Sequence, residues 1–396
     1  MAMAVKNRTV QRTSENAVKS NKKQKKVHAW NLEQPGEIDY TFLVIVILVV
    51  AAGLVMLLSA SAPAGKTMND NSYSFFGKQL LFAGIGFVGM WFVSRINYNS
   101  YKDLLPKMMG ICMILLVLVL FPGLGRKING SRRWLNTPVV PIQPSEFVKP
   151  VIAMCFAYMI EKGKTDLKTI QGNLPYVGVL LIVVSLMLCE THLSGAIVIA
   201  GIAVTVMIAG GTPVKPIIIG AAVLLPLGLI AVRLMSEVRW ERVVSFLHPF
   251  DDMQDSGYQV AQAIYAIGSG KLFGLGLGQS IQKYSYLPEP YNDFIFAIIC
   301  EELGFVGAVG VMGLFVLLII RGVRIAVNAP DVYGTLTATG IVAQLAIQTL
   351  LNIAVATSSV PNTGVALPFF SYGGTSIMTL LLEMGVLLNI SRYSRK

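Results

Sequence analysis

The stretch Lys283–Gly304, KYSYLPEPYNDFIFAIICEELG, passes from a polar segment into an apolar run and indicates the class of fold. Pro288 and Pro290 place a turn in its first half, and Asp293 is the last charged residue before the apolar residues Phe294–Cys300. A carboxylate at the border between water and lipid is costly to keep without a function. We therefore treat Asp293 as a candidate functional residue at the end of a membrane-spanning helix.

The composition of the whole chain is that of an integral membrane protein. Of its 396 residues, 54% are hydrophobic and 13% are charged, and soluble domains carry roughly 25% charged residues. The formal net charge is +11, and much of it precedes the first apolar run. This position favours a role in membrane orientation over nucleic-acid binding. The cysteines lie in apolar segments without metal-ligand spacing, so we expect no disulfide framework.

The apolar runs predict an all-α polytopic membrane protein with about ten transmembrane helices, because backbone groups inside a bilayer need internal hydrogen-bond partners. The predicted spans are Tyr40–Ala60, Phe76–Val93, Lys107–Phe121, Phe147–Ile160, Leu174–Cys189, Ser194–Ala209, Pro216–Leu234, Phe294–Ile320, Gly334–Val355 and Pro368–Ile390. An even number of spans places both termini on one side. Basic residues near both ends predict that this side is the cytoplasm.

The chain is predicted to contain two domains and one large loop. Residues 1–37 are polar and basic, and we expect a disordered cytoplasmic tail before a membrane domain at residues 38–396. Residues 235–292 form a large extracellular loop between helices 7 and 8, with an interfacial helix at Tyr258–Ile267. In Gly268–Ser280, GSGK lacks the other residues of a phosphate-binding loop, so its glycines indicate flexibility near a substrate headgroup.

Charged residues inside the predicted spans mark a second candidate region. Glu146 and Lys149 lie three residues apart at a helix start, so they share a face and can form an ion pair. Such a pair either locks the helix in place or lines a path for a lipid headgroup. Glu301 and Glu302 follow Asp293 by about two helical turns, and the helical period does not establish a second acid at the same site.

The predicted outer loop Gly123–Pro144 runs against the rule that basic residues stay inside. Its basic residues are Arg126, Lys127, Arg132 and Arg133. Either the loop is solvated and the basic tail outweighs it during insertion, or these cations bind an anionic ligand on the outer face. The sequence leaves both interpretations open.

Four motifs resemble the SEDS family, which includes FtsW, RodA and SpoVE of bacterial cell division, elongation and sporulation. They are NGSRRWL at Asn129–Leu135, IQPSEFVK at Ile142–Lys149, GLGLGQSIQKYSYLPEPYNDFIFAIICEELGFVG at Gly274–Gly307 and LPFFSYGGTS at Leu367–Ser376. The resemblance covers about Leu43–Arg395 and is closer to the FtsW and SpoVE branch of Gram-positive bacteria than to RodA. In one departure, His192 replaces the family's acidic residue between the fifth and sixth spans.

This resemblance implies a peptidoglycan glycosyltransferase that polymerises lipid II, a disaccharide-pentapeptide on undecaprenyl pyrophosphate, at the outer face of the bacterial plasma membrane. The implied partners are a class B penicillin-binding protein, other divisome proteins and membrane lipid, with the division septum as the expected location. We expect no nucleic acid. The sequence requires no cofactor, and a divalent cation could share the phosphate role. The family's essential acidic residue corresponds to Asp293.

Such a reaction requires a base for the acceptor sugar hydroxyl and cations for the leaving pyrophosphate. We assign Asp293 as the base. The candidate substrate-binding residues are Lys283, Arg133 and Arg132 for the pyrophosphate, Glu146 and Lys149 along the headgroup path, and Glu289 in the motif of Asp293. The alternatives are a lipid II transporter (flippase), which moves lipid without forming bonds, and a scaffold that recruits the penicillin-binding protein.

Overall fold

The computed structural model describes residues 35–128, 131–137, 141–163, 166–220 and 257–394, together with residues 222, 226, 233, 246 and 250. The chain divides into two compact units, Met1–Glu37 and Ile38–Lys396. Nearly all of the predicted tail lies outside the described residues. The helices that position the candidate site belong to the second unit.

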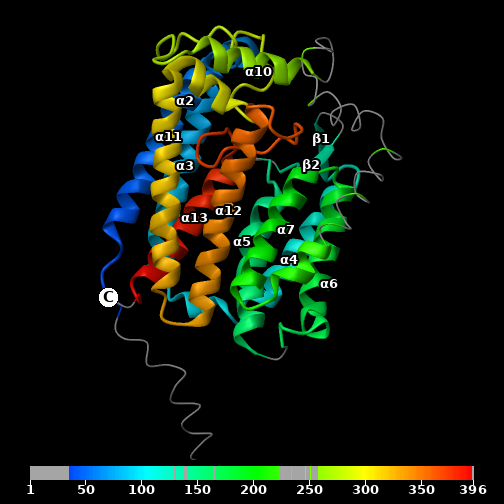
Figure 1. Ribbon diagram of the computed structural model, residues 1–396. Coiled ribbons are helices and arrows are strands. Elements are labelled where there is room, and N and C mark those ends of the chain that lie inside the picture. The colour runs from blue at the N-terminus through cyan, green and yellow to red at the C-terminus, as the bar shows by residue number, and fades with distance from the viewer. Residues whose placement is uncertain are drawn as a thin grey trace, which may run out of the picture. The chain divides into compact units, whose positions relative to one another are not determined.

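The second unit is built from helices that run side by side (Figure 1). They are α2 (Tyr40–Asn69), α3 (Ser74–Val93), α4 (Leu105–Leu120), α5 (Pro144–Glu161), α6 (Ile170–Cys189), α7 (Leu193–Ala209), α11 (Ile295–Val327), α12 (Val332–Ala356) and α13 (Gly374–Ser391), with a short 3₁₀ helix η1 (Tyr98–Tyr101). Within the described residues, α2, α3, α6, α11, α12 and α13 are long and apolar enough to cross a membrane.

These helices confirm the predicted all-α polytopic membrane protein. The total of ten spans stays a prediction, because most of the predicted span Pro216–Leu234 lies outside the described residues. The core is made of apolar side chains between the helices, and many apolar side chains also remain exposed on the outer faces of the helices. Such exposed apolar faces are the expected surface of a protein whose solvent is lipid.

Two helices extend past their predicted ends, and one begins later. The helix α2 continues to Asn69, where Asp70 ends it in a left-handed conformation. The helix α11 continues beyond Ile320, and its Arg321 forms an ion pair with Asp39 at 2.8 Å. The predicted start of the last span at Pro368 is wrong, because Ser371 Oγ accepts a hydrogen bond from the Leu367 N–H and holds this segment in a turn.

A glycine-rich loop packs into a break in α11. At Gly304 the backbone adopts φ 68° and ψ −170°, which interrupts the helical hydrogen bonds. The N–H groups of Phe305 and Val306 instead donate to the carbonyls of Lys271 and Leu272, at 2.9 and 3.1 Å. The segment before Asp293 is therefore joined to α11 by backbone hydrogen bonds.

The glycines of this loop serve close packing. Gly274 has φ +78°, and a Cβ atom at this position would lie 2.6 Å from the Gly304 nitrogen. A left-handed conformation with a backbone so close admits only glycine without strain. We therefore attribute Gly274 to packing, while the predicted flexibility near a substrate headgroup stays a prediction.

Two smaller elements lie at the same end of the helices (Figure 1). The helix α10 (Tyr258–Ser269) confirms the predicted helix at Tyr258–Ile267, and it packs against α11 and α12. The predicted outer loop between α4 and α5 contains an antiparallel hairpin of β1 (Gly125–Ile128) and β2 (Ser131–Leu135), which packs on α4.

Candidate active site

Asp293 is half-buried and lies just before the start of α11. Its backbone carbonyl accepts a hydrogen bond from Asn352 Nδ2 of α12 at 2.8 Å. The carbonyl of the preceding residue, Asn292, accepts a hydrogen bond from Ser371 Oγ in the segment that leads into α13. Distant parts of the chain thus fix the backbone at Asn292 and Asp293, and this backbone positions the Asp293 carboxylate.

The turn before Asp293 is fixed by side chains as well. Asn292 Nδ2 donates to Glu289 Oε2 at 2.6 Å. The ring of Tyr291 lies 4.7 Å from that of Phe75, and the Tyr372 N–H donates to the Tyr291 carbonyl at 2.9 Å. Burial raises the pKa of Tyr291 to about 12, so its phenol stays neutral. The structure places Glu289 in a hydrogen bond that stabilises this turn.

Gly364, in the connection between α12 and α13, lies against the carboxylate of Asp293. Its φ is +69°, and a Cβ atom there would lie 3.0 Å from Asp293 Oδ2. On its other side, Ser194 Oγ at the start of α7 donates to the Gly364 carbonyl at 3.4 Å. This contact brings the corner between α6 and α7 next to Asp293.

Buried polar side chains gather at the corner between α6 and α7. Glu190 is 1% exposed, and within the described part of the chain neither of its carboxylate oxygens has a hydrogen-bond partner. His192 is 6% exposed, and its Nδ1 also lacks a partner there. Arg133 Nη2 of β2 donates to the Thr191 carbonyl at 2.7 Å, and Thr191 Oγ1 donates to Ser131 Oγ at 2.8 Å.

Both titratable groups of this corner are uncharged at neutral pH. Burial raises the pKa of Glu190 to about 8, although the charge of Arg133 opposes the rise. Burial lowers the pKa of His192, and the charges of Arg133 and Lys149 lower it further. Glu190 therefore does not neutralise the positive charge of Arg133 at pH 7. An anionic ligand close to Arg133 would then meet no negative charge on Glu190.

The raised pKa of Glu190 should make the stability of the protein depend on pH. Its folded pKa of about 8 lies above the ordinary value of 4.5, so between these values the folded state holds a proton that the unfolded state has lost. Stability from this group is complete below pH 4.5 and falls as pH rises toward 8. We expect Glu190→Gln to remove this loss and to melt above wild type at pH 9. Thermal unfolding in detergent at pH 5 and pH 9 measures it, and equal pH slopes in both proteins would contradict it.

The predicted ion pair of Glu146 and Lys149 is present. Lys149 Nζ lies 2.7 Å from Glu146 Oε1, and the two side chains are 3% and 8% exposed. The charge of Lys149 also acts on His192, so the pair borders the corner between α6 and α7.

Two other predicted cations bond to different elements. Arg132 precedes Arg133 in β2, and successive side chains of a strand point to opposite faces. Arg132 Nη1 accordingly donates to the Leu120 carbonyl at the end of α4, at 3.2 Å. Lys283 Nζ lies 2.7 Å from Glu302 Oε1 and 3.1 Å from Ser59 Oγ. These contacts do not gather Lys283, Arg132 and Arg133, the three cations predicted to bind the pyrophosphate, at one place.

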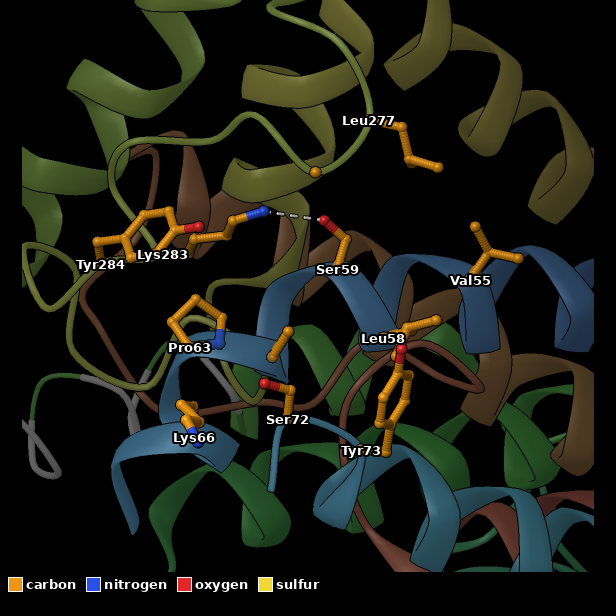
Figure 2. A pocket seen from close by; sticks show the side chains of 12 residues that line it. Val55, Leu58, Ser59, Pro63, Lys66, Ser72, Tyr73, Leu277, Lys283 and Tyr284 are labelled. Carbon is orange, nitrogen blue, oxygen red and sulfur yellow. Dashed lines mark hydrogen bonds between the residues drawn. The ribbon is translucent and has the colours of Figure 1, made fainter. Parts of the chain in front are cut away.

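Lys283 lines a pocket of about 530 Å³ between α2 and the loop before Asp293. Figure 2 shows its side chain directed at Ser59 of α2. The lining residues are Val55, Leu58, Ser59, Ala62, Pro63, Lys66, Ser72, Tyr73, Leu277, Gly278, Lys283 and Tyr284. Asp293 is not among them, and the buried ion pair with Glu302 indicates a structural role for Lys283.

Glu301 and Glu302 both hold this loop. Glu301 accepts hydrogen bonds from Ser280 Oγ and from the Ile281 N–H, and Glu302 accepts from the Ser280 N–H as well as from Lys283. These contacts give both buried carboxylates a structural role, which their spacing from Asp293 in the sequence could not predict. Among the described residues, no three His, Cys, Asp or Glu side chains gather as a metal site requires.

Sequence reasoning missed Glu190. It treated the corner between α6 and α7 only as a departure from a family pattern, because His192 stands where an acid is usual. An acid directly after a long apolar helix, Ile170–Cys189, was a usable signal, since a charge at such a border is costly.

These observations define a polytopic helical membrane protein with a half-buried carboxylate, Asp293, joined through Gly364 to a polar corner that holds Arg133, at one end of its helices. The chain belongs to the FtsW, RodA and SpoVE family, whose model, described as cell cycle protein, matches residues 39–396.

Two similar proteins each cover 90% of the chain. Stage V sporulation protein E of Bacillus subtilis is 42% identical over 358 residues, which are 90% of this chain and 98% of that protein. A probable peptidoglycan glycosyltransferase FtsW of Trichlorobacter lovleyi is 40% identical over 357 residues, 90% of this chain and 93% of the relative.

Solved structures share the fold. A chain of a peptidoglycan synthase complex, described for the coordination of polymerization and crosslinking, matches with a TM-score of 0.77 and 28% identity, covering 90% of this chain and 98% of its own. The rod shape determining protein RodA of Thermus thermophilus matches with a TM-score of 0.68 and 26% identity, covering 91% and 98%.

Proposed function

We propose that this chain is a peptidoglycan glycosyltransferase that polymerises lipid II into glycan strands, with Asp293 as the general base. The observation that carries the proposal is the fixed, half-buried position of Asp293, which Gly364 and Ser194 join to the polar corner between α6 and α7. Asn352 and Ser371 hold the backbone around the carboxylate, and the contacts through Gly364 connect it to the corner that bonds Arg133. The names of the FtsW relatives and of the synthase complex support the same activity.

In the proposed reaction, Asp293 accepts the proton of an acceptor sugar hydroxyl as its oxygen bonds to the anomeric carbon of the donor. The bond from that carbon to the lipid pyrophosphate breaks, and the electron pair leaves with the phosphate oxygen. Cations near the leaving oxygen stabilise the developing charge. We assign this role to Arg133 and Lys149, because they border the corner between α6 and α7 that Ser194 and Gly364 join to Asp293. The contacts of Lys283 and Arg132 join these two residues to other elements.

The proposed partners follow from the same activity. A class B penicillin-binding protein would cross-link the new strands, with other divisome proteins around it at the septum. A solved complex that combines polymerization and crosslinking supports such a partner. A divalent cation bound with the pyrophosphate stays a prediction.

The proposed function is tested with purified protein and purified lipid II, with and without the cognate class B penicillin-binding protein. We expect glycan strands, separated by gel electrophoresis, in at least the reaction that contains the partner. If lipid II crosses a liposome membrane but no strand forms in either reaction, the transporter becomes the better hypothesis.

A further inference from the structure

Among the buried acids of the described residues, Glu190 alone has neither carboxylate oxygen in a hydrogen bond. Glu301, which is equally buried, accepts hydrogen bonds from Ser280 and Ile281. Glu302 is bonded to Lys283 and Ser59. Both oxygens of Glu190 lack a hydrogen-bond partner among the described residues, although the side chain is 1% exposed. A buried polar group without a partner costs about 1–3 kcal/mol, so its retention indicates a ligand.

The neighbours of Glu190 narrow the choice of ligand. His192 Nδ1, two residues along the chain, is also without a partner within the described residues. Its ring is confined by Gly195, because a Cβ atom there would lie 2.7 Å from His192 Cε1. Thr191 between them has φ +58°, an uncommon conformation for this residue, held by Arg133 and Ser131. The corner thus holds two fixed, buried polar groups whose hydrogen-bonding positions are unfilled among the described residues.

The charge state of the corner favours a neutral polar ligand at these two groups. Burial keeps Glu190 protonated and His192 unprotonated at neutral pH. A carboxylic acid offers one donor and one acceptor, and a neutral imidazole offers one of each on its two nitrogens. Sugar hydroxyl and acetamido groups have the same mixture of donors and acceptors, whereas a phosphate offers chiefly acceptors.

We propose that Glu190 and His192 form a subsite for an N-acetylated sugar of the substrate, beside Asp293. Glu190 is a binding residue that orients the sugar ring so that its hydroxyl meets the Asp293 carboxylate. Arg133, which donates to the Thr191 carbonyl, keeps its proposed role toward the phosphate. This inference rests on the proposed function, and it assigns a sugar contact to a corner whose usual acidic residue is absent from this chain.

The test measures binding without turnover. The probe is the soluble disaccharide of N-acetylglucosamine and N-acetylmuramic acid, which has no lipid pyrophosphate and cannot act as donor. Saturation-transfer NMR with the full-length protein in detergent reports the Kd. Glu190→Met keeps the side-chain size but removes every hydrogen bond, and we expect it to weaken binding about tenfold or more. Glu190→Gln keeps one donor and one acceptor, and we expect it to stay close to wild type.

Ser131→Ala is the matched control, because it removes the hydrogen bond to Thr191 in the same corner without touching Glu190. We expect it to bind the disaccharide nearly as wild type does. Equal affinity of Glu190→Met and wild type would overturn the subsite, and so would an equal loss in the Gln and Met variants. Lipid II polymerisation measured in parallel keeps the two proposals separate: loss of strand synthesis concerns the proposed function, and loss of disaccharide binding concerns the subsite.

Discussion

Asp293→Asn is expected to lower the rate of lipid II polymerisation by roughly 10²–10⁴-fold, the range that general base catalysis contributes. The amide has almost the same shape but cannot accept the proton of the sugar hydroxyl. The hydrogen bond from Asn352 goes to the backbone carbonyl of Asp293, so the substitution leaves it in place. Strand synthesis by purified protein with its partner measures the effect.

The control is Asp103→Asn, which removes an exposed carboxylate between η1 and α4. It should polymerise lipid II at the wild-type rate. Thermal unfolding of Asp293→Asn should also match that of wild type, which separates lost chemistry from lost folding. A folded Asp293→Asn protein that makes strands at the normal rate would remove Asp293 from the role of base.

Lys283→Ala is expected to destabilise the protein by about 3–5 kcal/mol, the usual cost of removing one partner from a buried ion pair. The side chains of Lys283 and Glu302 are 3% and 0% exposed, and their charged atoms lie 2.7 Å apart. Without the ammonium group, the Glu302 carboxylate keeps only the hydrogen bonds from Ser59 and the Ser280 N–H. Thermal or denaturant unfolding in detergent measures the loss.

The double variant Lys283→Met with Glu302→Gln tests the reason for the loss. It removes both charges at similar volume, and replacing a whole buried pair is often nearly neutral, so we expect it to recover most of the stability. Donor kinetics of the double variant then decide the catalytic question. Wild-type KM and kcat for the donor would show that Lys283 only joins the loop to α2 and α11. A selective loss of donor use would support the predicted role of Lys283 in binding the pyrophosphate.

Composition and apolar runs were sufficient to predict the class of fold, because a bilayer leaves the backbone few alternatives to the helix. The ends of the helices were harder to predict. The apolar pattern of the first span stops at Ala60, but α2 continues through Pro63 and Gly65 to Asn69, so neither hydropathy nor helix propensity marks its end. The last span was predicted to begin at Pro368, but α13 begins at Gly374. The hydrogen bond from the Leu367 N–H to Ser371 Oγ holds the preceding segment in a turn, and hydropathy does not report such a bond.

The candidate site was predictable only in part. The spacing of Glu146 and Lys149 predicted their ion pair, because both lie on one helix and local geometry suffices. The partner of Lys283 could not be predicted, since two nearby acids were equally available in sequence and the loop packing at Gly304 selects Glu302. The link between Asp293 and the corner that holds Glu190 depends on Ser194 and Gly364, which lie far apart along the chain.

The hydrogen bonds that hold the backbone around Asp293 have a mechanical consequence. The carbonyls of Asn292 and Asp293 are tethered to the segment before α13 and to α12. A tilt of α12, or a shift of the segment before α13, would therefore displace the backbone that carries the proposed base.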